Sequence, residues 1–457
     1  MNKNQQEKWY DNFSKTKKSS HKNNTNKSEQ KTKITKKNES AKKSSSQKNY
    51  VSKQKKADCD AIKNKMFNWE NVPTESQQIL NTFNDIVSDI RNLNGKQKIQ
   101  LPGLIKKLSH QLTDDRNSRR LGYMNDNSLL SAYISYFMWW NLVRLTKLFS
   151  NLPKNAFQLN DKDVALDIGS GPLTVPIALW LARPELRDKK LTFYCMDLSQ
   201  IALTAGEELY LSIAAKTIKN NQEPWKIIRI KGPFGTQLKQ TPSLITCANV
   251  FNEIIQNIEM PADFLAKKYT KELTSYFDKD STQNQTILVI EPGDPHSARL
   301  VSLMRDAFMR NGFLPISPCT HSHSCPMEGR TTSNPSGKWC NFAFNTEDSP
   351  EELKKLSSKA NLTKERAVLS YVLMQKNIDK TIQTEENTDY VELRITSDFI
   401  KLPEIHKSGY YCCSKFGLVL AIDKSNIHPS NGDLIRIKTP KKIDQKDKKT
   451  GAPIIDI

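Results

Sequence analysis

The chain has 457 residues, a formal net charge of +20 and 8 cysteines. This length can bury a large core and exceeds a typical single domain, so we expect several domains that need no disulfide cross-links. The N-terminus lacks the apolar segment of a secretory signal and no run of about 18 uncharged apolar residues occurs, which predicts a soluble, intracellular protein with reduced thiols.

The positive charge is concentrated in an N-terminal arm. Residues 1–57 contain 17 Lys, no Arg and 4 acidic residues, so the arm carries +13 and the rest of the chain +7. The arm is rich in Lys, Ser and Asn and poor in apolar residues, so burial cannot offset its ordering entropy, and we expect disorder. It is either a solubilising tail or an arm that binds RNA phosphates in a salt-dependent way. A mitochondrial presequence would favour Arg and an amphipathic helix.

Residues 60–155 are predicted to be helical. Apolar residues recur at helical spacing from Thr74 to Ile90, and residues 101–112 indicate a second helix. A third helix is expected to begin after Asp126 and to end before Pro153. Its aromatic side chains are interpreted as core residues rather than as a base-stacking surface.

Residues 156–375 predict an α/β domain with a parallel sheet. The short apolar runs "VALDIG", "LTFYCMD", "WKIIRI", "SLITCANV" and "TILVIEP" alternate with helical stretches, as expected for strands joined by crossover helices. Residues 388–437 indicate a β extension with turn signals, and residues 438–457 a basic tail.

A nucleotide site is predicted where the first of these strands meets a helix. Glycines in "LDIGSGPLT" allow a sharp turn and a close approach of ligand, and the second strand ends in an aspartate that suits ribose hydroxyls. A tight turn without a ligand is the alternative. The predicted cofactor-binding residues are Asp167, Gly169, Ser170, Gly171, Asp197 and Asn249.

The pattern favours S-adenosylmethionine over NAD. A dinucleotide site would need a third glycine at the position of Thr174, whereas Asp-x-Gly-x-Gly followed by an acidic end of the second strand is typical of class I methyltransferases. Glycine often stands at the position of Leu173 in these enzymes, so this leucine bears on cofactor affinity. "CANVFNEI" supplies Asn249, Asn252 and Glu253 but lacks an Asn-Pro-Pro-Tyr or Asp-Pro-Pro-Tyr motif. No catalytic residue is assigned.

The loop "PCTHSHSCPMEGR", residues 318–330, gathers two cysteines and two histidines, and "KWC" adds Cys340. A disulfide is disfavoured in a reducing compartment, and the Pro-Cys pair resembles that of thiolate enzymes that attack pyrimidines. The spacing is wider than in common zinc ribbons, so a metal site and inert buried thiols both stay open. The histidines are expected to be solvated.

Six motifs occur in a familiar order: "RRLGYMNDNSLLSAYISYF", "LDIGSGPLT", "VIEPGDP", "PCTHSHSCPM", "WCNF" and "LSYVLM". Over about residues 75–437 the chain resembles the methyltransferase-like assembly proteins of the small ribosomal subunit, found in bacteria and mitochondria. The resemblance implies a class I methyltransferase Rossmann-like fold that binds S-adenosylmethionine, with the small ribosomal subunit and its rRNA as partners. We expect no DNA or membrane partner, and a cytoplasmic, bacterial location rather than the mitochondrial matrix.

The resemblance also implies a metal centre. In that family four cysteines hold a four-iron, four-sulfur cluster, and the fourth family cysteine maps to Cys413 in "CSKFG", with Cys412 as an adjacent rival. Thiolates suit zinc equally well by type. The implied ligands are Cys319, Cys325, Cys340 and Cys413.

Two functions follow from these observations. One is a methyltransferase that modifies rRNA, and the other is an assembly factor that binds rRNA without methyl transfer. The missing catalytic motif and Leu173 favour the second, whereas the glycine turn and Asp197 favour at least cofactor binding.

Overall fold

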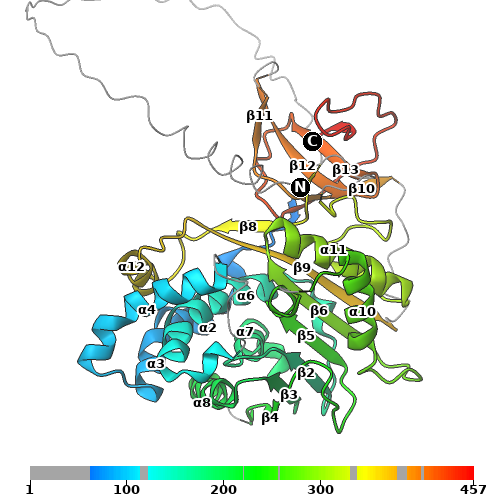
Figure 1. Ribbon diagram of the computed structural model, residues 1–457. Helices are drawn as coiled ribbons and strands as arrows, with labels where there is room; N and C mark the ends of the chain where they lie inside the picture. Colours follow the sequence, from blue (N-terminus) through cyan, green and yellow to red (C-terminus); the bar gives the residue numbers. More distant parts are fainter. Residues whose placement is uncertain are drawn as a thin grey trace, which may run out of the picture. The chain divides into compact units, whose positions relative to one another are not determined.

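The computed structural model describes residues 62–113, 122–219, 221–255, 258–329, 337–377, 389–402 and 406–457. The predicted Lys-rich arm lies outside the described residues. Figure 1 shows a helical region, an α/β domain and a second, largely antiparallel sheet. Within the described part, no helix is both long enough and apolar enough to cross a membrane.

The α/β domain is built on a sheet with the strand order β4-β3-β2-β5-β6-β9-β7. Strands β2 to β6 run parallel, and β9 lies antiparallel between β6 and β7. This is the strand order of class I methyltransferases, so the predicted fold class is confirmed. The strands are β2 (Val164–Ile168), β3 (Thr192–Asp197), β4 (Lys226–Lys231), β5 (Leu244–Ala248), β6 (Gln285–Pro292), β7 (Leu314–Ser317), β8 (Phe342–Asn345), which pairs with β9, and β9 (Arg366–Lys376).

Helices cover both faces of this sheet, which explains why its central strands β2 and β5 are buried along nearly their whole length. One core contains side chains of α7 (Thr174–Ala182) and α8 (Gln200–Thr217) together with the helical region. The other contains side chains of α9 (Phe251–Ile254), α10 (Ala262–Thr274) and α11 (Pro295–Arg310). Figure 1 shows α10 and α11 on the face opposite α7. Helix α12 (Glu351–Lys359) follows β8.

The helical region begins with α2 (Thr74–Asn81), α3 (Phe83–Ile90) and α4 (Gly95–Thr113). The single helix predicted from residue 74 to residue 90 is two helices, because the backbone leaves the helical conformation at Thr82. The aromatic third helix consists of α5 (Asn127–Ala132), the π-helical segment η6 (Tyr133–Met138) and α6 (Trp139–Asn151). Trp139 is 1 % exposed and lies in the core as interpreted, whereas Tyr133 and Phe137 are only partly buried.

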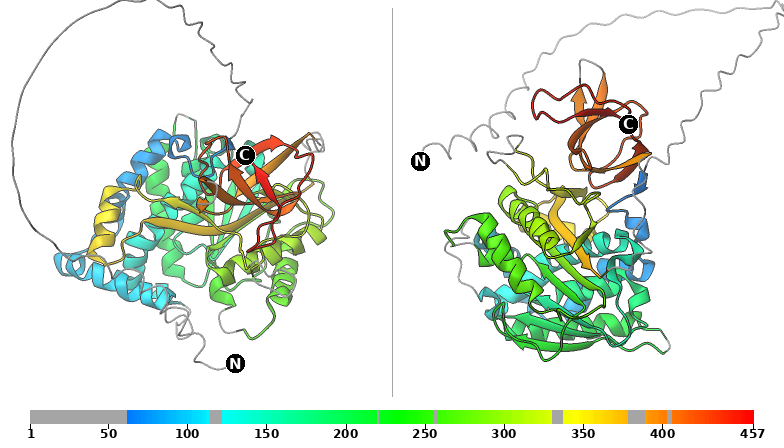
Figure 2. Two further views of the ribbon diagram at one scale, coloured as in Figure 1. Left: turned by 90° about the horizontal axis from the view of Figure 1, so that it is seen from above. Right: turned by 90° about the vertical axis from the view of Figure 1, so that its right-hand side faces the viewer.

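The second sheet has the order β1-β14-β10-β12-β13-β15, with β11 paired to β12, and is separate from the first (Figure 2). It takes in two segments that the sequence patterns placed elsewhere. β1, from the predicted helical region, pairs with β14, and β15, from the predicted basic tail, pairs with β13. The strands are β1 (Ile62–Asn64), β10 (Tyr390–Ile395), β11 (Ile400–Leu402), β12 (Lys407–Ser414), β13 (Gly417–Asp423), β14 (Leu434–Lys438) and β15 (Ile454–Asp456).

Candidate functional site

The glycine turn after β2 lies at the carboxyl end of the sheet, where the strand order reverses. Ligands of open α/β sheets bind at such a switch point. Gly169 has φ of 66° and Gly171 has φ of 51°, a conformation that favours glycine. A Cβ atom on Gly169 would lie 2.4 Å from Cγ2 of Val250, so that position also requires glycine for space. The turn therefore exposes backbone rather than side chains to the cleft.

Asp197, at the end of β3, joins the glycine turn to the next helix. Its Oδ2 accepts a hydrogen bond from the Gly171 amide at 2.9 Å, and its Oδ1 accepts one from the Ser199 amide at 2.8 Å. Burial raises the pKa of Asp197, and the backbone donors partly offset this effect. A carboxylate has about four acceptor sites, so two backbone donors leave capacity for ribose hydroxyls.

The six predicted cofactor residues lie in two places, at the surface of the cleft and buried beneath the glycine turn. Four of them line one cleft, namely Gly169, Gly171, Asp197 and Asn249. Asp167 is fully buried beneath the turn, where its Oδ1 accepts from the Thr246 hydroxyl at 2.6 Å. The Ser170 hydroxyl donates to the Asp167 carbonyl at 2.9 Å. These two residues shape the turn, and a direct contact of either with a cofactor stays a prediction.

Leu173 does not narrow the cleft. It has φ of 58° in the left-handed region that glycine prefers, but its side chain is fully buried in the core. The left-handed backbone conformation of Leu173 therefore costs about 1–2 kcal/mol, but its side chain does not occupy the space in which a ligand would bind.

The cleft has a volume of about 640 Å³, within the range of small-molecule sites. The helical region supplies one of its walls through Tyr133, Phe137 and Asn141. The loop after β5 supplies Asn252 and Glu253. The amide Oδ1 of Asn252 is buried and has no hydrogen-bond partner. The cleft can thus hold a nucleoside at the glycine turn and a second group near Asn252.

Glu291 supports the cleft and was missed by the sequence analysis. Its Oε1 accepts from the amides of Val250 at 3.0 Å and Phe251 at 2.8 Å, and its Oε2 accepts from the Asn252 amide at 3.1 Å. The side chain is fully buried, and burial raises its pKa to about 8 although the three amides lower it. A lone acidic residue at the end of the apolar run "TILVIEP" was the available signal.

Asp167 gives the first testable prediction. Burial raises its pKa from 3.8 to about 7, while the hydrogen bonds from Thr246 and Ser170 lower it. A raised carboxyl pKa contributes stability that is present below the unfolded pKa and lost as pH rises through the folded pKa. This loss corresponds to up to about 4 kcal/mol between pH 4 and pH 7.

Asp167→Asn should remove that pH dependence, because an amide does not titrate. Urea unfolding of wild type and variant at several pH values measures it. The variant should gain stability relative to wild type as pH rises, and a constant difference across this window would contradict the assignment.

The four predicted metal ligands line a second, small cavity. Cys319, Cys325, Cys340 and Cys413 border it together with His321. The Nε2 of His321 lies 3.2 Å from Sγ of Cys413. Cys412 faces the opposite side of β12 and packs in the core of the second sheet. The structure therefore brings Cys413, and not Cys412, to the other three thiols.

Burial disfavours the thiolate form of three thiols of this cavity. Burial raises the pKa of Cys325 to about 11, and it raises the pKa of Cys340 and Cys413 well above the ordinary value, with further increases from neighbouring cysteines. Burial also lowers the pKa of His321 to about 4. Among the described residues, no three Cys, His, Asp or Glu side chains are arranged as a metal-binding group. The structure thus shows that the four thiols border one cavity, and it does not show them arranged as the complete ligand set of a metal ion.

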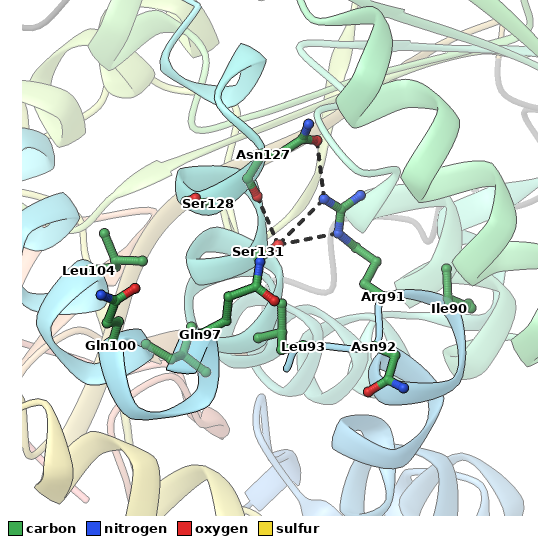
Figure 3. A pocket seen from close by; sticks show the side chains of 11 residues that line it. Ile90, Arg91, Asn92, Leu93, Gln97, Gln100, Leu104, Asn127, Ser128 and Ser131 are labelled. Carbon is green, nitrogen blue, oxygen red and sulfur yellow. Dashed lines mark hydrogen bonds between the residues drawn. The ribbon is translucent and has the colours of Figure 1, made fainter. Parts of the chain in front are cut away.

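A third cavity, of about 250 Å³, lies in the helical region (Figure 3). Arg91 donates to the hydroxyl of Ser131 and to Oδ1 of Asn127, each at 3.4 Å. Side-chain amides of Asn92, Gln97 and Gln100 also line it. None of the predicted site residues lies here.

Solved structures with a similar chain course include several methyltransferases. A methyltransferase from Geobacter sulfurreducens, solved with S-adenosyl-L-homocysteine, is 11 % identical, with 51 % of this chain and 90 % of that chain covered and a TM-score of 0.27. A putative class I methyltransferase from Listeria monocytogenes is 11 % identical, with coverage of 68 % and 90 % and a TM-score of 0.28. The fold assignment rests on the strand order and not on these scores. No curated protein matches the chain.

A family model matches residues 160–387, which contain the parallel strands, the glycine turn and the first three cysteines of the small cavity. The family is described as mitochondrial small ribosomal subunit Rsm22. This match agrees with the resemblance carried by the sequence motifs. The chain belongs to the Rsm22 family.

Proposed function

We propose that the chain binds S-adenosylmethionine in the cleft and acts on the small ribosomal subunit or its rRNA. The observation that carries the cofactor assignment is the pair of hydrogen bonds by which Asp197 joins the glycine turn to the start of α8 at the switch point of the sheet. The family description supports the ribosomal partner. A cytoplasmic place of action stays a prediction.

Different cleft residues would contact different parts of the cofactor. The backbone at Gly169 and Gly171 leaves room for a ligand, and Asp197 has acceptor capacity for ribose hydroxyls. When bound, S-adenosylmethionine supplies an electrophilic methyl group. The unpartnered Oδ1 of Asn252 and the nearby Glu253 can accept hydrogen bonds from an N–H group that approaches this end of the cleft.

The four cysteines are proposed to hold an iron–sulfur cluster, with zinc as the alternative. Four thiols from two parts of the chain share one cavity, which fits either centre by ligand type. The buried Nε of Arg305, on the same cavity, has no hydrogen-bond partner, and sulfur ligands would offer it an acceptor. A bound cluster or zinc ion would stabilise thiolates that burial otherwise disfavours.

A non-catalytic assembly factor is the second candidate. The observation in its favour is the loop after β5, where Asn249 has φ of 57° and its Oδ1 lies 3.5 Å from a guanidinium nitrogen of Arg144. Arg144 is buried, so this contact places a protein cation next to the residue that begins the loop. With its amide oxygen engaged by Arg144, Asn249 is not available to orient a substrate group, and the cleft can bind cofactor without catalysing methyl transfer.

Gly171→Arg tests cofactor binding. A Cβ atom there would have ordinary contact space, with Met124 at 3.6 Å, so the long side chain can enter the cleft, although φ of 51° strains any residue other than glycine. We expect calorimetry to show binding of S-adenosylmethionine weakened by roughly a hundredfold or more, as for a blocked site that loses about 3 kcal/mol. Gly451→Arg is the matched control, because Gly451 has φ of 72° and open space around it but does not line the cleft.

The same variant separates the two functions in cells. If the chain is an rRNA methyltransferase, a methyl mark of the small-subunit rRNA should disappear with Gly171→Arg and persist with Gly451→Arg. An unchanged methylation map together with a small-subunit assembly defect on deletion of the gene would decide for the assembly factor. Equal cofactor affinity of wild type and Gly171→Arg, or no binding by wild type, would refute the cofactor site.

A further inference from the structure

Two buried arginines border the small cavity of the four cysteines, and neither is singled out by a sequence motif. Arg305, on α11, is 2 % exposed, and Arg394, on β10, is 7 % exposed. Both line the cavity that contains the thiols. Burying a guanidinium is costly unless it is paired or hydrogen-bonded, so two such residues around one cavity call for an explanation.

Hydrogen bonds to backbone carbonyls account for part of the stabilisation of these two buried guanidinium groups. Arg305 donates to the carbonyls of His321 and His323, within the cysteine loop. Arg394 donates through Nε to the Pro318 carbonyl at 2.9 Å, immediately before the loop's first cysteine. The segment that carries Cys319 is therefore held by side chains from two different elements.

The register of the second sheet places Arg394 directly opposite Cys413 on neighbouring strands. Side chains of such cross-strand partners lie on the same face of a sheet. Arg394 thus connects the Pro318 end of the loop to the strand that carries the fourth cysteine.

The other partners of the two arginines include carboxylates, but one N–H group of Arg305 at the cavity has no hydrogen-bond partner. Arg305 forms an ion pair with Asp306, whose other carboxylate oxygen accepts from the Cys325 amide at 3.3 Å. Its Nε is nevertheless buried without a hydrogen-bond partner. Arg394 also donates to the Gly432 carbonyl at 2.8 Å, and the buried carboxylate of Asp433 lies near enough to interact electrostatically with it.

We propose that Arg305 and Arg394 are positioning residues that hold the cysteine loop and balance the charge of a four-thiolate centre in this cavity. The proposal rests on the metal centre proposed above. Four thiolates give a zinc ion or a four-iron, four-sulfur core a net negative charge, and a buried negative charge is tolerated when cations compensate it. The unpartnered N–H of Arg305 supplies a donor for sulfur, a type of contact that tunes iron–sulfur potentials.

Cobalt binding to the metal-free, full-length chain tests this role whichever metal is native. Thiolate-bound Co²⁺ absorbs visible light, so an anaerobic titration with a competing chelator gives its affinity. We expect Arg305→Gln and Arg394→Gln each to weaken binding by roughly 10- to 100-fold, the usual effect of losing an outer partner of a metal ligand. Arg305→Lys and Arg394→Lys keep the charge and should recover most of the affinity.

Arg436→Gln is the matched control, since Arg436 lies in the second sheet and pairs with Glu392 at 2.7 Å away from the cavity. It should bind Co²⁺ like wild type. If the lysine variants bound Co²⁺ as weakly as the glutamine variants, the arginines would only hold the cysteine loop in place, and the proposed balance of charge would be refuted. Glutamine variants that match wild type would overturn both roles.

A reduction potential provides a second readout for protein that carries the cluster. Each glutamine variant should be harder to reduce than wild type, because a cation that stabilised the added electron is gone, and each lysine variant should stay close to wild type. An unchanged potential would contradict the proposal. Wild-type protein that binds neither Co²⁺ nor iron would refute the metal centre itself, which is a different result from a bound metal insensitive to the arginines.

Discussion

Serine in place of Cys319, Cys325, Cys340 or Cys413 is expected to release the metal and to loosen the second sheet. The first three thiols lie within 22 residues, and Cys413 follows Cys340 by 73 residues, so the centre closes a long chain segment. In a chain-entropy model, one cross-link over such a segment stabilises the fold by up to roughly 4 kcal/mol. Metal analysis and limited proteolysis measure the two effects.

Cys412→Ser is the matched control, because this neighbour packs in the core of the second sheet and not at the cavity. It should retain the metal and resist the protease. Anaerobically purified wild type should be brown, with equal amounts of iron and sulfide. Colourless protein with stoichiometric zinc would keep the four-cysteine site and replace the cluster, whereas metal-free, fully folded protein would refute the site.

Alanine in place of Glu291 is expected to lower the free energy of unfolding by roughly 3–5 kcal/mol, because it leaves buried amides without acceptors. Those amides belong to Val250, Phe251 and Asn252, which shape the cleft wall after β5. Glu291→Gln keeps one acceptor oxygen but turns an NH₂ group toward a backbone donor, so we expect an intermediate loss of about 1–3 kcal/mol. Denaturant unfolding and cofactor calorimetry on the same samples measure stability and binding.

Asp294→Asn serves as the control for Glu291. Asp294 also accepts from backbone amides, those of His296 and Ser297, but at a partly exposed helix start. Asparagine is a good residue at such a position, so the loss should stay below about 1 kcal/mol. If Glu291→Ala were no more damaging than Asp294→Asn, the three amides would not depend on the carboxylate.

Local patterns in the sequence were sufficient for the central sheet and for the glycine turn. Strands buried on both faces appear as largely apolar runs, and such runs correspond to β2, β3, β5 and β6, while β4 lies at the edge of the sheet. The turn at Gly169 and Gly171 was predictable because its backbone conformation favours glycine. Both features depend on residues close together in the chain.

Features that depend on distant residues required the tertiary structure. Whether Asp167 faces the cleft or the core is decided by Thr246, 79 residues away. The choice between Cys412 and Cys413 depends on which face of β12 meets the cysteine loop, and β1 and β15 are too short to show a pattern before they pair with β14 and β13.

The same reason explains why Glu291, Arg305 and Arg394 carried no recognisable motif. Each acts on backbone groups of another segment, so its role is set by the folded arrangement and not by its sequence neighbours. Hydrogen bonds to backbone groups need no particular residue type in the partner segment, which leaves no trace in that segment's sequence. The sequence by itself determined the layers and the turn, and tertiary contacts decided which polar side chains support the cleft and the cysteine cavity.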